Sequence, residues 1–272
     1  MSSSASSMDE PILPYNSNYR ILTPQDVTSF LQAYGVQESL RNIAIYRNSM
    51  VHKSYCTRKN ENFVDGNTNC PLDCLPLQEE SNERLEFLGD AVLGMTVASY
   101  LFERFPDENE GFLTRMRTKL VNGKMLAHLS KLVGLPPFVI LSKQIDENNG
   151  RDNLNILEDA FEAFIAAIYT DINYDAASTW IIGVIETHVD FADLINQNNN
   201  FKDQFLKAYQ QMHGYVPKFF EMNVNTQRNG QKLYTVCIKD AKDAVLAIGR
   251  GANKKEAEND AAKTAHAKLT LF

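Results

Sequence analysis

Residues 82–94, NERLEFLGDAVLG, constrain what this 272-residue chain folds into more than any other segment. Glu86 and Asp90 follow Glu83 by three and seven residues, so a helix carries all three carboxylates on one face. The residues between them are mostly apolar, which predicts a buried helix. Anions that crowd together away from water repel one another, and a divalent cation relieves that repulsion. Oxygen ligands of this kind favour magnesium or manganese over softer metals.

A second acidic pair lies on another predicted helix. Asp159 and Glu162 are three residues apart in the segment 155–171, NILEDAFEAFIAAIYTD, which is otherwise strongly apolar. Taken alone, such a pair is typical of a helix cap and a surface ion pair. Beside the acids of residues 82–94, it indicates the second half of one carboxylate cluster.

The charge of the chain is unevenly distributed. The total is −7, which is atypical of a protein that binds nucleic acid. Residues 199–272, however, contain 12 Lys and Arg and 7 Asp and Glu, whereas the preceding residues contain 15 basic and 27 acidic residues. An acidic body joined to a basic terminal piece predicts two domains with different electrostatic partners.

The sequence carries no apolar run that predicts a membrane span, and its Ser-rich start lacks the pattern of a secretory signal. We therefore expect an intracellular, cytoplasmic protein without membrane partners, with the nucleus, or the host cytoplasm for a viral chain, as alternatives. In such a compartment Cys56, Cys70, Cys74 and Cys237 are expected to be free thiols. A zinc site of His52 with the first three cysteines stays open, although its spacing fits no standard pattern.

Composition and periodicity divide the chain into four parts. Residues 1–20 are polar and rich in Ser, which predicts a flexible tail. Residues 21–191 are helical in period, apart from an aperiodic stretch at 57–81 that predicts a surface insertion. The Asn-rich residues 192–200 are expected to form a linker, and residues 201–272 a second domain.

The first helix is expected to begin at Thr23, an N-cap followed by Pro24. Residues 112–133 are predicted to be helical, and residues 144–155 to form a loop. The second domain is predicted to consist of a helix, three antiparallel strands and a second helix. Between its two helical ends, apolar and polar residues alternate as they do in strands. The other helices are expected at about residues 40–51, 82–105, 156–171 and 174–191.

Residues 82–94 resemble the signature helix of the ribonuclease III family. The D-x-x-E-A pattern of that family matches residues 159–163, and its H-x-S element matches residues 52–54. The pair Glu110-Gly111 and the run RMRTKLV at residues 115–121 also match. The resemblance covers about residues 25–190 and implies an all-α endonuclease domain.

The terminal piece resembles a double-stranded RNA-binding domain, which implies a small α+β fold of order α-β-β-β-α. The two matches in this order are those of the short, two-domain members of the family. The matching residues are Tyr209, Pro217, Gly230, Gly249, Gly251, Lys254, Lys255, Ala257, Glu258, Ala261, Ala262 and Lys263.

The resemblance implies a magnesium-dependent endonuclease that cuts double-stranded RNA, with Mn²⁺ as an alternative metal. Its products have 5′-phosphate and 3′-hydroxyl ends with short 3′ overhangs, cut by a homodimer of the catalytic domain. The family pattern assigns metal ligation to Glu86, Asp90, Asp159 and Glu162, with Asp90 and Glu162 as the catalytic pair. Glu83 and Glu110 match acidic positions near the substrate or behind the ligands.

The resemblance also implies RNA contacts by Gln204, Lys207, Lys232, Lys254 and Lys255. Two departures from the family pattern concern these contacts. Lys207-Ala208 stands where the family often has Gln-Glu, and Gln231-Lys232 follows Gly230 where the family often has Pro and His. We expect plain attraction for phosphate at Lys207 and Lys232 in place of specific hydrogen bonds.

An alternative of a different class is a protein that binds and sequesters double-stranded RNA, as an antagonist of silencing or sensing, with cleavage secondary or absent. Cleavage of a duplex in the presence of Mg²⁺ separates the two hypotheses.

Overall fold

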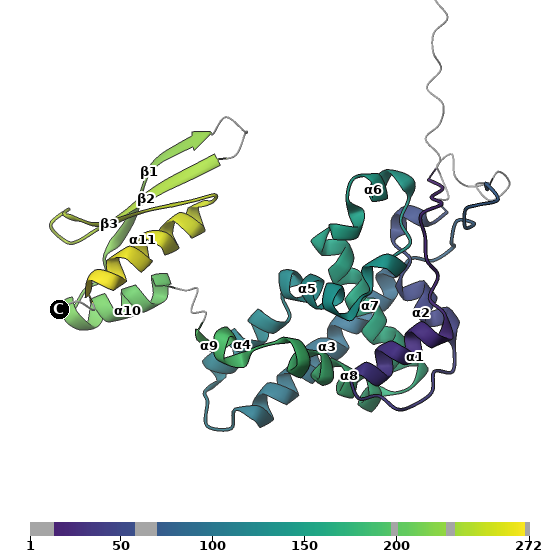
Figure 1. Cartoon of the computed structure of the whole chain (residues 1–272). Coiled ribbons are helices and arrows are strands. Elements are labelled where there is room, and N and C mark those ends of the chain that lie inside the picture. The colour runs from purple at the N-terminus through teal and green to yellow at the C-terminus, as the bar shows by residue number, and fades with distance from the viewer. Residues whose placement is uncertain (1–13, 58–69, 197–200, 227–231, 270–272) are drawn as a thin grey trace, which may run out of the picture. The chain divides into compact units, whose positions relative to one another are not determined.

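The computed structural model describes residues 14–57, 70–196, 201–226 and 232–269 (Figure 1). The chain divides into two compact units, Met1–Leu194 and Ile195–Phe272. The helices of the first unit are α1 (Pro24–Ala33), α2 (Ile43–Ser49), α3 (Glu83–Arg104), α4 (Glu110–Leu120), α5 (Gly123–Val133), α6 (Lys143–Glu147), α7 (Leu154–Asp171), α8 (Tyr174–His188) and α9 (Phe191–Asn196), with 3₁₀ turns η1 (Lys53–Tyr55), η3 (Pro136–Phe138) and η4 (Gly150–Asp152).

Helix α7 is the centre of the first unit, since α2, α3, α5 and α8 all pack against it (Figure 1). Residues 160–168 of this helix are all buried. The indole of Trp180, on α8, is fully buried against Phe161 and Phe164, and its N–H donates to the Phe30 carbonyl at 3.0 Å. A helix that is apolar on nearly every side is thus enclosed by its neighbours, as its composition requires.

The predicted start of the first helix is confirmed. Thr23 caps α1 as part of a capping box: its hydroxyl accepts from the Asp26 amide, and the Asp26 carboxylate accepts from the Thr23 amide. Pro24 stands at the first helical position, where a missing N–H costs nothing.

The helical stretch predicted over residues 112–133 is confirmed, but Asn122 divides it into α4 and α5. The side-chain oxygen of Asn122 accepts from the Met125 amide and caps α5. Its amide group donates to the Thr118 and Lys119 carbonyls at the end of α4. One side chain therefore satisfies the backbone of two helix ends, a role that apolar periodicity does not reveal.

The predicted tail is corrected where the structure describes it, at residues 14–20; residues 1–13 lie outside the described part. Tyr15 and Asn16 are buried. The Asn16 amide donates to the Leu141 carbonyl at 3.1 Å and to the Asp146 carboxylate at 3.0 Å, and Arg151 pairs with that carboxylate at 2.8 Å. This segment is therefore held against the body by a buried polar network.

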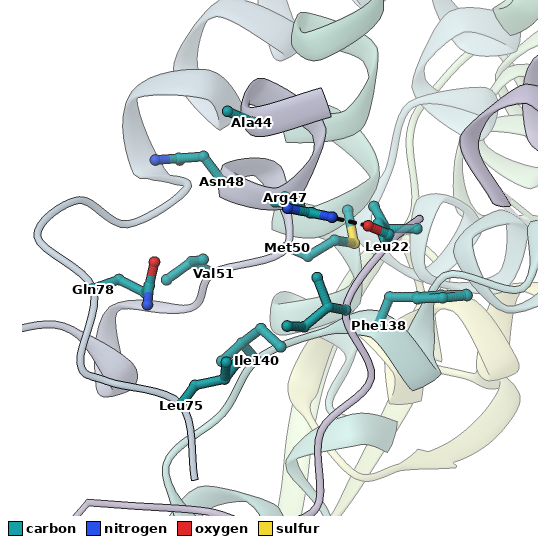
Figure 2. Close-up of a pocket in the computed structure, with 11 residues that line it drawn as sticks. Leu22, Ala44, Arg47, Asn48, Met50, Val51, Leu75, Gln78, Phe138 and Ile140 are labelled. Carbon is teal, nitrogen blue, oxygen red and sulfur yellow. Dashed lines mark hydrogen bonds between the residues drawn. The ribbon is translucent and has the colours of Figure 1, made fainter. Parts of the chain in front are cut away.

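The segment after Asn16 borders a surface cleft of about 350 Å³ between α2 and residues 138–140. Figure 2 shows Leu22, Met50 and Ile140 lining it, with the Arg47 guanidinium donating to the Leu22 carbonyl at 3.0 Å. The lining is mostly apolar, so this cleft does not suit a phosphate.

Three further boundaries differ from the expected ones. The stretch expected to be a loop at 144–155 contains α6 and η4, and the linker predicted at 192–200 begins with helix α9, in which Leu194 is buried. Of the predicted insertion at 57–81, residues 58–69 lie outside the described part. The remainder returns to the body, where the Thr57 amide donates to the Gln78 carbonyl at 2.9 Å and Leu77 is buried.

The second unit has the predicted order α10 (Phe201–His213), β1 (Lys218–Thr226), β2 (Lys232–Lys239), β3 (Val245–Gly251) and α11 (Lys254–Leu269). Its strands form an antiparallel sheet of order β1-β2-β3. Helix α11 lies against this sheet, with α10 beside it (Figure 1). A Cβ at Gly249 would lie 2.0 Å from the Ala261 backbone nitrogen, so glycine and small helical residues allow this close packing.

Helix α3 is long and apolar enough to cross a membrane by length and composition alone, among the residues the structure describes. The sequence-based expectation that no run has this length was therefore too strict. Core helices pass the same test. The contacts of α3 with α7, α8 and α4 identify it as a helix packed within the first unit.

Candidate active site

The two acidic helices cross at a glycine. A Cβ at Gly89 of α3 would lie 1.8 Å from the Glu162 carbonyl oxygen of α7, so only a glycine lets the two backbones approach so closely. Glu86 and Asp90 flank Gly89 on α3 and therefore lie beside Glu162. The predicted carboxylate cluster from two helices is thus brought together by a residue without a side chain.

Glu162 is the buried member of the cluster, with 7% of its surface exposed. Burial is the largest cause that raises its pKa, to about 8, and neighbouring negative charges add to the rise. The neighbours that act on it are Asp90, Glu158, Glu86 and Asp159. All four predicted ligands therefore lie within one electrostatic environment.

Asp159 and Glu86 are half-buried, and burial raises the pKa of each. Their acidic neighbours raise it further, whereas the ammonium group of Lys53 opposes the rise at both. Asp90 is exposed at the rim. The cluster thus runs from a buried carboxyl group to a solvent-facing one, with a cation at its edge.

Glu158 is a member of this cluster that our sequence analysis missed. Burial raises its pKa, followed by the charges of Glu86 and Asp90. Its carboxylate lies against the start of α5, where a Cβ on Gly123 would come within 2.2 Å of Glu158 Oε2. The sequence signal was available, because Glu158 precedes Asp159 on an apolar helix, but the spacing of the family motif does not include it.

The donor set fits a hard divalent cation. Every member contributes carboxylate oxygens. The pKa of Glu162 is raised first by burial and then by the neighbouring negative charges, and a bound cation would offset both effects. Among the described residues, no three His, Cys, Asp or Glu side chains are grouped closely enough to hold a metal ion as they stand. Ligation by Glu86, Asp90, Asp159 and Glu162 therefore requires these side chains to turn toward a common point.

The two acids predicted to lie near the substrate occupy different places. Glu83, at the start of α3, accepts from Lys53 Nζ at 3.0 Å and from Ser81 Oγ at 3.1 Å. Glu110 begins α4, accepts from Thr114 Oγ1 at 2.9 Å, and lines a separate cavity of about 380 Å³ beside Phe102. Glu83 thus adjoins the cluster, whereas Glu110 lies on another surface of the unit.

The histidine of the alternative zinc site has a structural role. His52 Nδ1 lies 2.8 Å from Ser54 Oγ and accepts from the Ser54 amide, and Ser54 Oγ in turn accepts from the Ser142 amide. This network fixes the turn that carries Lys53. Cys56 Sγ lies 3.9 Å from the His52 carbonyl oxygen. Among the described residues, Cys70, Cys74 and Cys237 are free thiols.

The predicted RNA contacts come from three elements of the second unit. Gln204 and Lys207 lie on α10, Lys232 begins β2, and Lys254 and Lys255 begin α11; the four lysines are exposed and Gln204 is half-buried. The Lys202 amide donates to Asn259 Oδ1 at 3.2 Å, and Lys202 Nζ pairs with Glu258 at 2.6 Å. These contacts hold the start of α10 beside the early turns of α11. Lys254 also lies 3.7 Å from Glu221 of β1.

Two family models match the chain. A ribonuclease-III-like model matches residues 42–188, and a double-stranded RNA binding motif matches residues 201–269. The first match spans more than half of the chain and contains both acidic helices. The second covers nearly all of the α-β-β-β-α unit.

Relatives cover most of the chain. The probable ribonuclease 3 of Acanthamoeba polyphaga mimivirus is 29% identical over 256 residues, or 93% of this chain and 47% of the relative. This chain thus spans about half of that relative's length. The ribonuclease 3 of Chlorobium chlorochromatii is 34% identical over 224 residues, or 82% of this chain and 84% of the relative.

Among solved structures, the nuclease domain of ribonuclease III from Campylobacter jejuni aligns at 29% identity with a TM-score of 0.48. The alignment covers 61% of this chain and 97% of that domain, whose region of dimer formation is flexible. Both family models and the bacterial relative agree with the two acidic helices and the small α+β unit. The chain belongs to the ribonuclease III family.

Proposed function

We propose that the protein is a Mg²⁺-dependent endonuclease that hydrolyses phosphodiester bonds of double-stranded RNA. The observation that carries the proposal is the carboxylate cluster around Glu162, which two helices assemble across Gly89. The proposed products have 5′-phosphate and 3′-hydroxyl ends with short 3′ overhangs.

Bound magnesium would supply a water of lowered pKa and stabilise negative charge on the attacked phosphate. Glu86, Asp90, Asp159 and Glu162 would hold it with carboxylate oxygens. Because Glu162 is buried at the crossing of α3 and α7, its position is fixed by the two helices, and the exposed Asp90 faces the solvent from which RNA arrives. Glu158 adds negative charge behind Asp159 and thereby strengthens the attraction of the cluster for cations.

We further propose a homodimer that pairs through α3. Phe87, Met95 and Phe102 are 81%, 64% and 71% exposed. They follow one another by eight and seven residues, so with Ala91 and Ala98 they form one apolar stripe along the helix. Exposed apolar area of this kind favours burial against a partner.

The stripe is self-complementary about its middle. Phe102 lies beside the cavity of about 380 Å³ that Ala98, Leu101 and Leu113 line, whereas Phe87 projects about 22 Å away along the helix. A twofold axis near Met95 would bring Phe87 of each protomer to that cavity on the other. The same pairing would bring the partner's Glu110 toward Glu83, which accounts for a site residue lying apart from the cluster.

The second unit would add affinity for duplex RNA. The chain from residue 199 onward is basic, and four exposed lysines occupy the predicted contact positions on α10, β2 and α11. Lysine contacts to phosphate read no base, so we propose recognition of duplex shape and backbone in place of sequence.

Cleavage of a labelled RNA duplex in Mg²⁺ tests the proposal, with wild type compared with Glu162→Gln. We expect the wild type to cut both strands at staggered positions and the variant to lose at least about a hundredfold in rate. Binding without cleavage by the wild type would instead support the sequestering protein. Equal cleavage by the variant would contradict the assigned cluster.

A further inference from the structure

Lys53 is the cation at the edge of the acidic cluster. It is the first residue of η1 and lies next to the first turn of α3. Its Nζ donates to Oε1 of Glu83, the first residue of α3, at 3.0 Å. Glu83 is the largest cause that raises the pKa of Lys53, and Asp159 and Glu86 raise it as well. The ammonium group is therefore charged and feels acids from both α3 and α7.

The backbone that carries Lys53 is held in place from two sides. The Asn82 amide donates to the Val51 carbonyl at 2.8 Å, which ties the turn to the start of α3. The His52 amide donates to the Ile140 carbonyl at 3.1 Å, and the Ser142 amide donates to Ser54 Oγ at 3.0 Å. The backbone of Lys53 is therefore held in place, while its long side chain can change rotamer.

The Lys53–Glu83 ion pair is easily exchanged. The two side chains are 62% and 52% exposed. Exposed pairs of this kind contribute about 0.2–1 kcal/mol, so another anion competes readily for the ammonium group. Glu83 keeps its bond from Ser81 Oγ and remains hydrated when Lys53 leaves it.

We propose that Lys53 binds a phosphate of the RNA strand that is cut, and that Glu83 holds the lysine at the cluster until the RNA displaces it. An acidic cluster repels the phosphates of an approaching RNA, and a cation at its rim reduces that repulsion. The ligand class is a phosphodiester backbone. This inference rests on the proposed ribonuclease function and adds a substrate-binding residue to it.

The test uses the whole 272-residue chain with Lys53→Gln, Lys53→Arg and the control Lys131→Gln. Lys131 also forms an exposed ion pair, with Asp152 at 2.6 Å. We expect Lys53→Gln to lower kcat/KM for an RNA duplex about tenfold, mainly through KM, since a hydrogen bond to a charged group is lost. Lys53→Arg should recover most of the loss, and Lys131→Gln should match wild type.

Binding is measured separately in a Glu162→Gln background, where cleavage does not interfere. Removing one phosphate contact should lower the slope of log Kd against log salt by about 0.7–0.9. Thermal denaturation should leave Lys53→Gln within about 1 kcal/mol of its parent, which excludes a folding defect.

Three outcomes are informative. An unchanged salt slope with unchanged kcat/KM would overturn the assignment of Lys53. A changed affinity for Mn²⁺ with an unchanged salt slope would also overturn it, because Lys53 would then act only on the acids. Failure of the wild type to bind duplex RNA would instead refute the proposed function, and would be seen before any Lys53 variant is compared.

Discussion

At the scale of single residues, Glu162 shows the cost of assembling the cluster. Its carboxyl group is buried among four other acids, and its pKa rises to about 8. In the unfolded chain the same group would titrate near its ordinary value of 4.5. Between these values the folded state keeps a proton that the unfolded state has released, so rising pH favours unfolding.

This pH dependence of the folding stability gives a prediction for the metal-free protein. In excess chelator, stability should fall as pH rises from about 5 to about 8, and Glu162→Gln should remove much of that fall. At pH 8 we expect the variant to melt about 5 °C above wild type. Differential scanning calorimetry across this pH range measures the effect.

Glu103→Gln is the matched control, because Glu103 is an exposed acid on α3. It should follow the wild-type curve. Added Mg²⁺ should reverse the order of wild type and Glu162→Gln, since only the intact cluster gains stability by binding it. A Glu162→Gln protein with the pH dependence of wild type would show that the buried charge is not the cause.

At the scale of helices and strands, sequence patterns predicted most elements, but few of the boundaries and contacts between them. The period of α7, the Thr23 cap and the three alternating strands were all readable, because each is a local property. The break at Asn122 depends on one side chain that serves two helix ends. The contact of Asn16 with Asp146 joins residues 130 positions apart, which no local pattern encodes.

The same distinction applies to the site. Four acids were predicted from spacing and family resemblance, and the structure places them in one electrostatic environment. Glu158 was missed because its place beside the cluster follows from the packing of α7 against α3 and α5, which no motif records. Glu110 was predicted near the substrate, and only the apolar stripe of α3 suggests how a second protomer would supply it.

The crossing of α3 and α7 makes a prediction about glycine. Gly89→Ala should destabilise the protein by about 3 kcal/mol or more, because a Cβ 1.8 Å from the Glu162 carbonyl forces two backbones apart. It should also weaken Mn²⁺ binding, since the acids on the two helices separate. Urea unfolding and Mn²⁺ titration provide the two measurements.

Gly94→Ala is the control on the same helix, since a Cβ there meets nothing within 4 Å in the single chain. Both glycine substitutions are compared in a Phe87→Glu background, because Gly94 lies on the face of α3 that we propose pairs with a second protomer. Gly94→Ala should stabilise the protein by about 0.5–1 kcal/mol, because alanine favours a helix over glycine. Similar gains for both substitutions would contradict the close helix crossing.

At the scale of the whole molecule, the exposed stripe on α3 predicts self-association. Phe87→Glu should convert a dimer into a monomer, because a charge in an apolar interface is left without a partner. The fold should survive, since Phe87 is 81% exposed in the single chain. Sedimentation velocity distinguishes the two states.

Leu72→Ser is the control for removing an exposed apolar side chain elsewhere, as Leu72 is fully exposed in the turn at residues 71–74. It should leave the sedimentation coefficient unchanged. A wild-type monomer at micromolar concentration, or a Phe87→Glu dimer, would rule out the proposed pairing.

The enclosure of Trp180 gives the first unit its own optical signal. Trp180 is the one tryptophan of the chain, and it is fully buried on α8 of the first unit, where it packs against α7. Intrinsic emission excited at the red edge of its absorption therefore follows that unit alone. The second unit contributes only tyrosines, among them Tyr209 and Tyr215, whose hydroxyl groups lie 3.0 Å apart. Fluorescence and far-ultraviolet circular dichroism, recorded on one sample, would thus separate unfolding of the first unit from unfolding of the second without dividing the chain.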